Sequence, residues 1–202
     1  MITIIKTEIS NSYSVQKSLD RIGYKSLITD KKDDIKKASM IILPGVGSFD
    51  ALVRSLEDND LISVLKDRVK NDLTPTLGIC LGMHVLTTKS EEGKMNGLGL
   101  IDAEVRKFNS SQNLKVPHFG WNSVESKNSL KLTKNCQNSF YFAHSYYVKC
   151  RNKENILLST TYGEDFCSAF ISNNIIGVQF HPEKSNKSGL KFLDNVLRYF
   201  NV

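Results

Sequence analysis

The stretch Thr76-Leu77-Gly78-Ile79-Cys80-Leu81-Gly82 indicates the fold more directly than any other part of the chain. Its first four residues are typical of a buried strand, and a helix is expected from Leu81 onward. Glycines two positions before and after Cys80 are typical of a tight strand-to-helix turn, because larger side chains there would collide. At the helix amino terminus, the free backbone amides favour a thiolate on Cys80, and the amide of Leu81 can face a developing oxyanion.

On the amino-terminal side of this turn, short apolar runs alternate with helix-like segments. This β-α alternation predicts a parallel sheet with helices on both faces. Asn11 or Ser12 is expected to cap the first helix, and Gly23 to end it. The expected strands are at 2–5, 26–29 and 40–43, and the expected helices are at about 11–22, 49–56 and 61–69.

Beyond about Leu98 the strand-like runs follow one another with only turns between them, which predicts additional antiparallel strands. The expected fold is therefore α/β, with an open, mostly parallel central sheet flanked by helices and extra antiparallel strands in the second half. A last helix is expected from about Ser188. The expected additional strands are at 104–108, 146–150, 156–161, 168–171 and 175–180.

The bulk composition excludes several classes of protein. The chain has 202 residues, enough for one core, and we expect a single domain over 1–202. Its net charge of +6 is scattered, and no basic stretch interleaved with aromatic residues predicts nucleic-acid binding. No apolar run predicts a signal peptide or a membrane span. The four cysteines form no CxxC pair, so we expect no metal site, structural roles for Cys136, Cys150 and Cys167, and a cytoplasmic protein with reduced thiols.

His181 is the best candidate for a base acting on Cys80, since it alone of the four histidines has a carboxylate, Glu183, two residues on. In an extended segment, residues i and i+2 face the same side, and Pro182 fixes the backbone between them. Glu183 can then accept the proton of one imidazole nitrogen while the other nitrogen faces Cys80, as activation of a thiol requires. The run 176–180 predicts a strand that delivers His181 to the carboxyl edge of the sheet.

Together with further segments, these residues resemble the class I, triad-type glutamine amidotransferases, and among them the glutaminase subunits of imidazole glycerol phosphate synthase. The resemblance extends from the first strand to the last helix and implies a flavodoxin-like fold. The matching segments are Leu43–Phe49, Gly78–Met83, Pro117–Asn122, Phe140–Tyr147 and Gly177–Ser185.

This resemblance implies a role for each matching residue. The implied reaction is hydrolysis of glutamine through a thioester on Cys80, without a cofactor. The implied partner is a (β/α)8-barrel synthase that forms a heterodimer with the chain and makes imidazole glycerol phosphate and AICAR in histidine biosynthesis. The implied residues are Cys80, His181 and Glu183 for catalysis; Val46, Gly47 and Leu81 for the oxyanion; Gly45, Gly82, His84, Ser145 and Tyr146 for the substrate; and Asn11, Trp121, Asn122 and Lys184 for the partner.

Two departures from the family pattern keep a related function open. The stretch 6–11 retains only Asn11 of the family's Asp-Tyr-Gly-x-Gly-Asn, and His84 stands where the family usually has Gln. A paralogous glutaminase that supplies ammonia for amidination of a surface-polysaccharide sugar is therefore the alternative. The contact of Trp121 with a partner also has an alternative, a core tryptophan.

Proteins of other classes fit less well. A non-catalytic binding subunit would be expected to lose Cys80, His181 or Glu183, and all three are present. A thiol redox enzyme would show a resolving cysteine near Cys80 in sequence, and none is there. A cysteine peptidase would not require the segment Pro117–Asn122. Pyridoxal phosphate synthase glutaminases share the triad, but the segments around Trp121 and Lys184 match them poorly.

Overall fold

The computed structural model describes residues 1–109, 114–128, 130–136 and 138–202. Its strands are β1 (Ile2–Ile5), β2 (Ser26–Thr29), β3 (Met40–Gly45), β4 (Thr76–Cys80), β5 (Lys89–Ser90), β6 (Ala103–Lys107), β7 (His118–Ser123), β8 (Glu125–Ser126), β9 (Ser139–His144), β10 (Tyr146–Cys150), β11 (Ile156–Tyr162), β12 (Glu164–Ser172) and β13 (Ile175–Val178). Its α-helices are α1 (Ser12–Arg21), α2 (Lys32–Lys36), α3 (Phe49–Asp58), α4 (Ile62–Lys70), α5 (Leu81–Val85) and α6 (Asn186–Tyr199). Short 3-10 helices are η2 (Lys131–Thr133), η3 (Lys153–Asn155) and η4 (Pro182–Lys184).

β4 lies inside a sheet that, within the described residues, has 11 strands in the order β2-β1-β3-β4-β13-β12-β10-β6-β5, with β11 on β12 and β8 on β11. The strands from β2 to β13 in this order are all parallel to their neighbours. β12, β10 and β11 add antiparallel pairs, and β7 and β9 form a separate antiparallel pair. The predicted α/β fold, with parallel strands joined to antiparallel strands from the second half, is confirmed.

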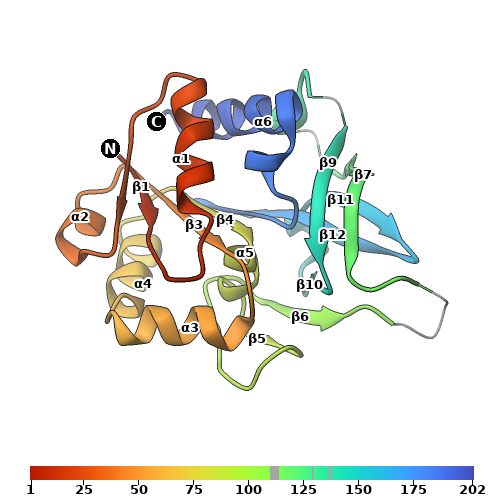
Figure 1. Cartoon of the computed structure of the whole chain (residues 1–202), viewed down its shortest axis with the longest axis horizontal. Coiled ribbons are helices and arrows are strands. Elements are labelled where there is room, and N and C mark those ends of the chain that lie inside the picture. Colours follow the sequence, from red (N-terminus) through yellow and green to blue (C-terminus); the bar gives the residue numbers. More distant parts are fainter. Residues whose placement is uncertain (110–113, 129, 137) are drawn as a thin grey trace.

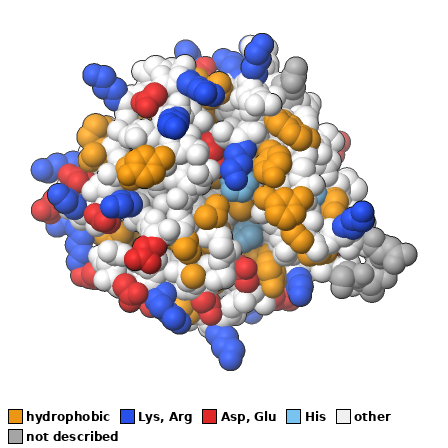
Figure 2. Space-filling model, in the orientation of Figure 1, with side chains coloured by type: hydrophobic (Ala, Val, Ile, Leu, Met, Phe, Trp, Pro, Cys, Tyr) orange, Lys and Arg blue, Asp and Glu red, His pale blue; other side chains and the backbone are white. Residues whose placement is uncertain are grey.

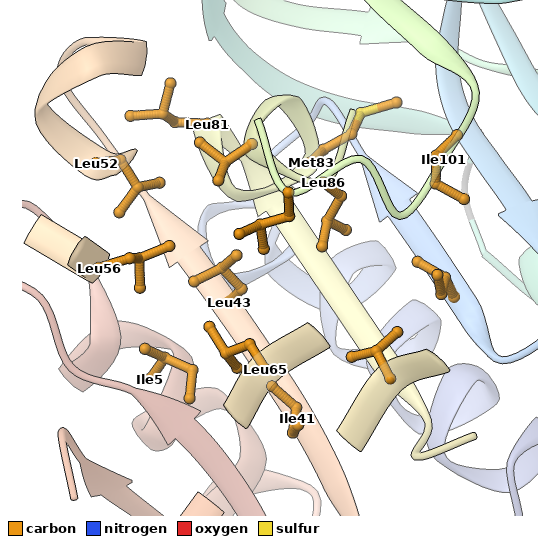
Figure 3. Close-up of a cluster of buried hydrophobic side chains, with 14 of the residues drawn as sticks. Ile5, Ile41, Leu43, Leu52, Leu56, Leu65, Leu81, Met83, Leu86 and Ile101 are labelled. Carbon is orange, nitrogen blue, oxygen red and sulfur yellow. The ribbon is translucent and has the colours of Figure 1, made fainter. Parts of the chain in front are cut away.

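Apolar side chains cover both faces of the parallel strands, as their unbroken apolar sequences predict. Ile4 of β1 packs into the core on the side of α1 and α6, whereas Ile5 packs into the core on the side of α3 and α4. Figure 1 shows these two pairs of helices on opposite faces of the sheet. In Figure 3, Leu43 of β3 and Leu81 of α5 lie in one of these cores beside Leu52 of α3. The start of α5 is therefore anchored by buried apolar contacts.

The structure decides two local expectations. Asn11 is the N-cap residue of α1 but makes no capping hydrogen bond, because its side chain donates to Glu183; the hydroxyl of Ser12 donates to the carbonyl of Ile5. Trp121 is on strand β7 and is 50% exposed, so the alternative of a core tryptophan is wrong. In the described part of the chain, no helix is long and apolar enough to cross a membrane.

Candidate active site

Cys80 is held in a strained backbone conformation at the corner between β4 and α5. Its φ of 53° and ψ of −111° lie where non-glycine residues are rare, and such strain is commonly found at functional sites. A Cβ on Gly82 would lie 1.8 Å from the carbonyl oxygen of Leu43, and one on Gly78 would lie 2.9 Å from the backbone nitrogen of Met83. Only glycine fits at these two positions, so the tight corner follows from the glycine spacing around Cys80.

The topology brings three candidate segments to one edge of the sheet. β3, β4 and β13 are neighbouring parallel strands, so their carboxyl ends lie side by side. β3 ends in the loop with Val46 and Gly47, β4 ends at Cys80, and β13 leads to His181. In open α/β sheets this edge is where ligands bind.

His181 and Glu183 form a buried pair beside Cys80. The Nδ1 of His181 lies 2.8 Å from Oε1 of Glu183, and the two side chains are 3% and 1% exposed. Asn11 Nδ2 donates to the same carboxylate oxygen at 3.0 Å. Since Nδ1 is engaged with Glu183, Nε2 is the nitrogen left for Cys80, whose influence raises the pKa of the imidazole.

The electrostatics favour a charged imidazole. Burial by itself would lower the pKa of His181, but the charge and hydrogen bond of Cys80, together with Glu183, outweigh it and raise this pKa to about 10. For Glu183, burial likewise opposes ionisation, yet the hydrogen bonds from His181 and Asn11 keep its pKa below the usual value. At neutral pH the site therefore holds a protonated His181 against the carboxylate of Glu183.

The backbone of His181 is fixed from two other elements. Its amide donates to the carbonyl of Tyr141 on β9 at 2.9 Å, and its carbonyl accepts from the hydroxyl of Ser185 at 2.6 Å. That hydroxyl oxygen also accepts from the amide of Tyr141 at 3.0 Å. The imidazole is thus attached to β9, which comes from the second half of the chain.

A cavity of about 270 Å³ opens over Cys80. Figure 2 shows histidine side chains at the bottom of a hollow on this face, with hydrophobic side chains around it and a basic side chain at its edge. Among the described residues, no group of His, Cys, Asp or Glu side chains could hold a metal ion. The lining residues are Val46, Gly47, Cys80, Leu81, His84, Glu92, Pro117, Ala143, His144, Ser145, Tyr146, His181 and Lys184.

Some of the residues predicted for substrate or partner lie outside this cavity. Gly45 and Gly82 do not line it, because they are packed against each other: a Cβ on Gly45 would lie 3.1 Å from the nitrogen of Gly82. Trp121 is on the exposed side of β7, next to Phe119 in the strand's alternation. Lys184 lines the cavity, and its ammonium lies 5.9 Å from the ring centre of Tyr141.

In the loop after β3, the backbone amide of Val46 is not free to donate a hydrogen bond to an oxyanion. The amide of Val46 donates to the carbonyl of Ile9 at 3.0 Å, so it is unavailable to an oxyanion while this bond exists. Gly47 has a φ of 92°, which glycine adopts at little cost, so the loop can change conformation here. The expectation of a Val46 oxyanion amide therefore does not describe this conformation.

Asn122 belongs to a chain of hydrogen bonds behind the cavity wall. Burial lowers the pKa of His118 to about 4 and that of His144 well below its usual value, so both rings are neutral. His144 Nδ1 donates to the carbonyl of Tyr146 at 2.7 Å, and its Nε2 accepts from His118 Nδ1 at 3.0 Å. Asn122 Nδ2 faces the remaining nitrogen of His118 at 3.3 Å and also donates to the carbonyl of Thr161. Asn122 thus helps to fix the Ser145–Tyr146 wall.

Sequence reasoning missed two side chains of the site. Glu92 lines the cavity, and its Oε2 accepts from the amide of Phe49 at 3.0 Å. Gln179 lies behind Cys80, where its Nε2 is 3.9 Å from the sulfur and its Oε1 is 2.7 Å from Nε2 of His84. The signal for Gln179 was present, since it is two residues before His181 on an extended segment and so faces the same side. Glu92 gives no comparable local signal.

Known proteins are similar to this sequence along nearly its whole length. The model of the family described as Glutamine amidotransferase class-I matches residues 3–198. The imidazole glycerol phosphate synthase subunit HisH 2 of Methanococcus maripaludis is 48% identical over 200 residues, covering 98% of this chain and 99% of that protein. The subunit HisH 2 of Pseudomonas aeruginosa is 41% identical over 197 residues, covering 96% of this chain and 98% of that protein.

Solved structures with lower sequence identity share the fold. A glutamine amidotransferase crystal structure superposes with a TM-score of 0.76 at 16% identity, covering 100% of this chain and 99% of that chain. A chain of PurLQS from Thermotoga maritima gives a TM-score of 0.73 at 18% identity, covering 98% of this chain and 97% of that chain.

Proposed function

The chain belongs to the class I glutamine amidotransferase family, and we propose that it is the glutaminase subunit of an imidazole glycerol phosphate synthase in histidine biosynthesis. In this proposal, Cys80, His181 and Glu183 hydrolyse glutamine to glutamate and ammonia, and a (β/α)8-barrel subunit consumes the ammonia. The thiol of Cys80 must stay reduced for this chemistry, which fits action in the cytoplasm.

One observation carries the proposal: Cys80 lies at a strained corner, at the base of a cavity, and interacts there with an imidazole that a buried carboxylate holds. A nucleophile, a base and a group that orients the base are the requirements of covalent acyl transfer. A cysteine that served only as a packed hydrophobic residue would need neither the backbone strain nor the buried Glu183.

In the first half of the reaction the thiolate of Cys80 attacks the carbonyl carbon of the glutamine side chain. The tetrahedral intermediate carries a negative oxygen, which the amide of Leu81 can face from the start of α5. His181 then gives its proton to the leaving nitrogen, the C–N bond breaks, and ammonia departs from a thioester on Cys80.

In the second half His181, now neutral, takes a proton from water as the water oxygen attacks the thioester. The C–S bond breaks, glutamate leaves, and the thiolate and the imidazolium are restored together. Glu183 stabilises the charged imidazole in both halves through its 2.8 Å contact with Nδ1. One water is consumed, and one glutamate and one ammonia are formed.

The occupied amide of Val46 indicates low activity in the absence of the partner. While that amide is bonded to Ile9, the oxyanion has no second donor. A partner that changes the conformation of the loop at Gly47 would free the amide for this role. The proposed docking face includes Trp121 with its neighbour Asn122, Asn11, and Lys184 at the cavity edge. The exposed Phe119 and Trp121 provide the kind of aromatic anchors that interfaces favour.

The test is a glutamate-release assay on the purified chain, alone and with the barrel synthase from the same source bound to its own ligand. We expect slow release by the chain alone and at least about a tenfold increase with the liganded partner. Trp121→Ala should leave the slow rate unchanged and weaken the activation. Absence of glutamate release under both conditions would refute the proposal.

Glu92 is proposed to bind the α-ammonium of glutamine, since it supplies a carboxylate to the cavity lining. Burial raises the pKa of Glu92, and the hydrogen bond from the Phe49 amide opposes this rise. We expect Glu92→Gln to raise KM for glutamine roughly tenfold with little change in kcat.

Glutaramate, which is glutamine without its α-amino group, provides the control for this variant. The KM for glutaramate should be the same in the wild type and in Glu92→Gln, because the lost contact is absent from both reactions. An equal rise of KM for both substrates would show that the variant disturbs the cavity and not one contact.

The alternative function, supply of ammonia for amidination of a surface-polysaccharide sugar, is favoured by the altered stretch Lys6–Ser10. This stretch reaches the site, because the Ile9 carbonyl holds the Val46 amide. The glutaminase chemistry is the same in both proposals, and the partner differs. Assaying the chain with each candidate synthase distinguishes them, as does the gene next to its own: a barrel synthase among histidine genes, or sugar-modifying genes.

A further inference from the structure

Gln179 and His84 form a buried polar pair behind the nucleophile. The Oε1 of Gln179 lies 2.7 Å from Nε2 of His84, and the Nε2 of Gln179 lies 3.9 Å from the sulfur of Cys80. Gln179 is 0% exposed and His84 is 3% exposed. Burial of an amide without hydrogen-bond partners is costly. The contacts with His84 and Cys80 therefore account for a polar side chain at the buried position 179.

The direction of each hydrogen bond follows from the charge state of His84. Burial lowers the pKa of His84 to about 4, so the ring is neutral at pH 7 and has one N–H. The carbonyl oxygen of Gln179 can only accept, which places this N–H on Nε2 of His84. The amide NH2 of Gln179 is then directed at the sulfur of Cys80 as its donor.

We infer that Gln179 is a positioning residue that stabilises the thiolate of Cys80 through its side-chain amide, and that His84 acts through Gln179 by fixing the direction of that amide. The inference rests on the proposed glutaminase function, in which a thiolate is both the attacking and the leaving group. A dipole directed at a thiolate in a water-poor site stabilises it more than it would in water. When the thioester forms, the sulfur loses its charge and this contact weakens.

The substitution at position 84 then has a structural account. The family usually has Gln there, and either side chain can donate one N–H to the carbonyl of Gln179. Histidine keeps this donor in a rigid ring. The Nδ1 of His84 has no hydrogen-bond partner, so the contact with Gln179 is its one polar attachment among the described residues.

The experiment is alkylation of Cys80 by iodoacetamide as a function of pH, read by mass spectrometry of the peptide that contains Cys80. In Gln179→Met, which keeps the side-chain length without the amide, the midpoint of the pH profile should rise by about one pH unit. At high pH, where the sulfur is fully ionised, the rate constant should rise about threefold, because a less stabilised thiolate is a stronger nucleophile. A purely structural disturbance would lower the rate at high pH.

His84 variants separate its two possible roles. His84→Leu should also raise the midpoint of the alkylation profile, and His84→Gln should keep it at the wild-type value. If His84 acts only through Gln179, adding His84→Leu to Gln179→Met produces no further change. If Gln179→Met fails to fold, His84→Leu and His84→Gln give the same test. The other titratable groups around the cavity are unchanged in every variant: Glu92, His144, Tyr146, His181, Glu183 and Lys184.

An unchanged midpoint in folded Gln179→Met would overturn the role of Gln179 in stabilising the thiolate. A further shift in the double variant would overturn the action of His84 through Gln179. Alkylation needs neither glutamine nor a partner, so its result is independent of the glutamate-release assay. A chain without glutaminase activity refutes the proposed function. A chain with glutaminase activity and an unshifted profile refutes only the role of Gln179.

Discussion

Replacing Cys80 by Ala should lower glutamine-dependent synthesis in the complex with the partner by a factor of at least about 10⁴, because no other group in the cavity can form the thioester. Synthesis from added ammonium should continue at nearly the wild-type rate, since the partner's own reaction does not require the sulfur. Both rates are measured in the same assay of product formation, with glutamine or with an ammonium salt. The variant should fold normally, because Ala occupies the strained backbone at φ 53° no less readily than Cys.

Cys136→Ala is the matched control for loss of a thiol. Cys136 is half-buried, lies outside the cavity and is near Asn195 of α6, so its removal should leave glutamine-dependent synthesis intact. Glutamate release that persists in Cys80→Ala would show that another group is the nucleophile. Loss of the ammonium-dependent rate as well would indicate a broken complex and would contradict the independence of the two reactions.

The parts of the site that could be predicted from sequence are those that one short segment specifies. The strand-to-helix corner at Cys80 follows from two glycines and an apolar strand, and the pairing of His181 with Glu183 follows from their spacing on an extended segment. Gln179 could have been found by the same spacing argument.

The parts that could not be predicted depend on contacts between distant segments. The Asn11 amide reaches Glu183 across 172 positions, and the Phe49 amide reaches Glu92 across 43. No periodicity encodes such pairs, because they form only when the sheet assembles. Strand β7 was missed for the same reason: its ladder partner is β9, and alone its sequence from Pro117 has the residues of a turn.

The paired thiols of Cys150 and Cys167 are a further example. They were expected to have structural roles, and nothing in their spacing of 17 positions suggests contact. The antiparallel pairing of β10 with β12 places their sulfurs 3.8 Å apart in the core. Both remain free thiols, so their shared position reflects strand register and not a disulfide.

Replacing Gly82 by Ala should lower the free energy of unfolding by more than about 3 kcal/mol, a large share of the roughly 5–15 kcal/mol that stabilises a domain. The added Cβ would lie 1.8 Å from the carbonyl oxygen of Leu43, an atom of the backbone of β3. β3 cannot withdraw without breaking its pairing with β1 on one side and with β4 on the other. Urea unfolding followed by circular dichroism measures the effect.

Gly99→Ala is the matched comparison, because Gly99 has a φ of 61° and no atom within 4 Å of a Cβ built on it. That substitution should cost only about 1 kcal/mol, the usual price of a left-handed conformation for Ala. The difference between the two variants therefore isolates the collision at the corner from the loss of a glycine. Equal destabilisation of the two variants would mean that β3 and α5 separate easily. The close approach of Gly82 to β3 would then not be what fixes the position of Cys80.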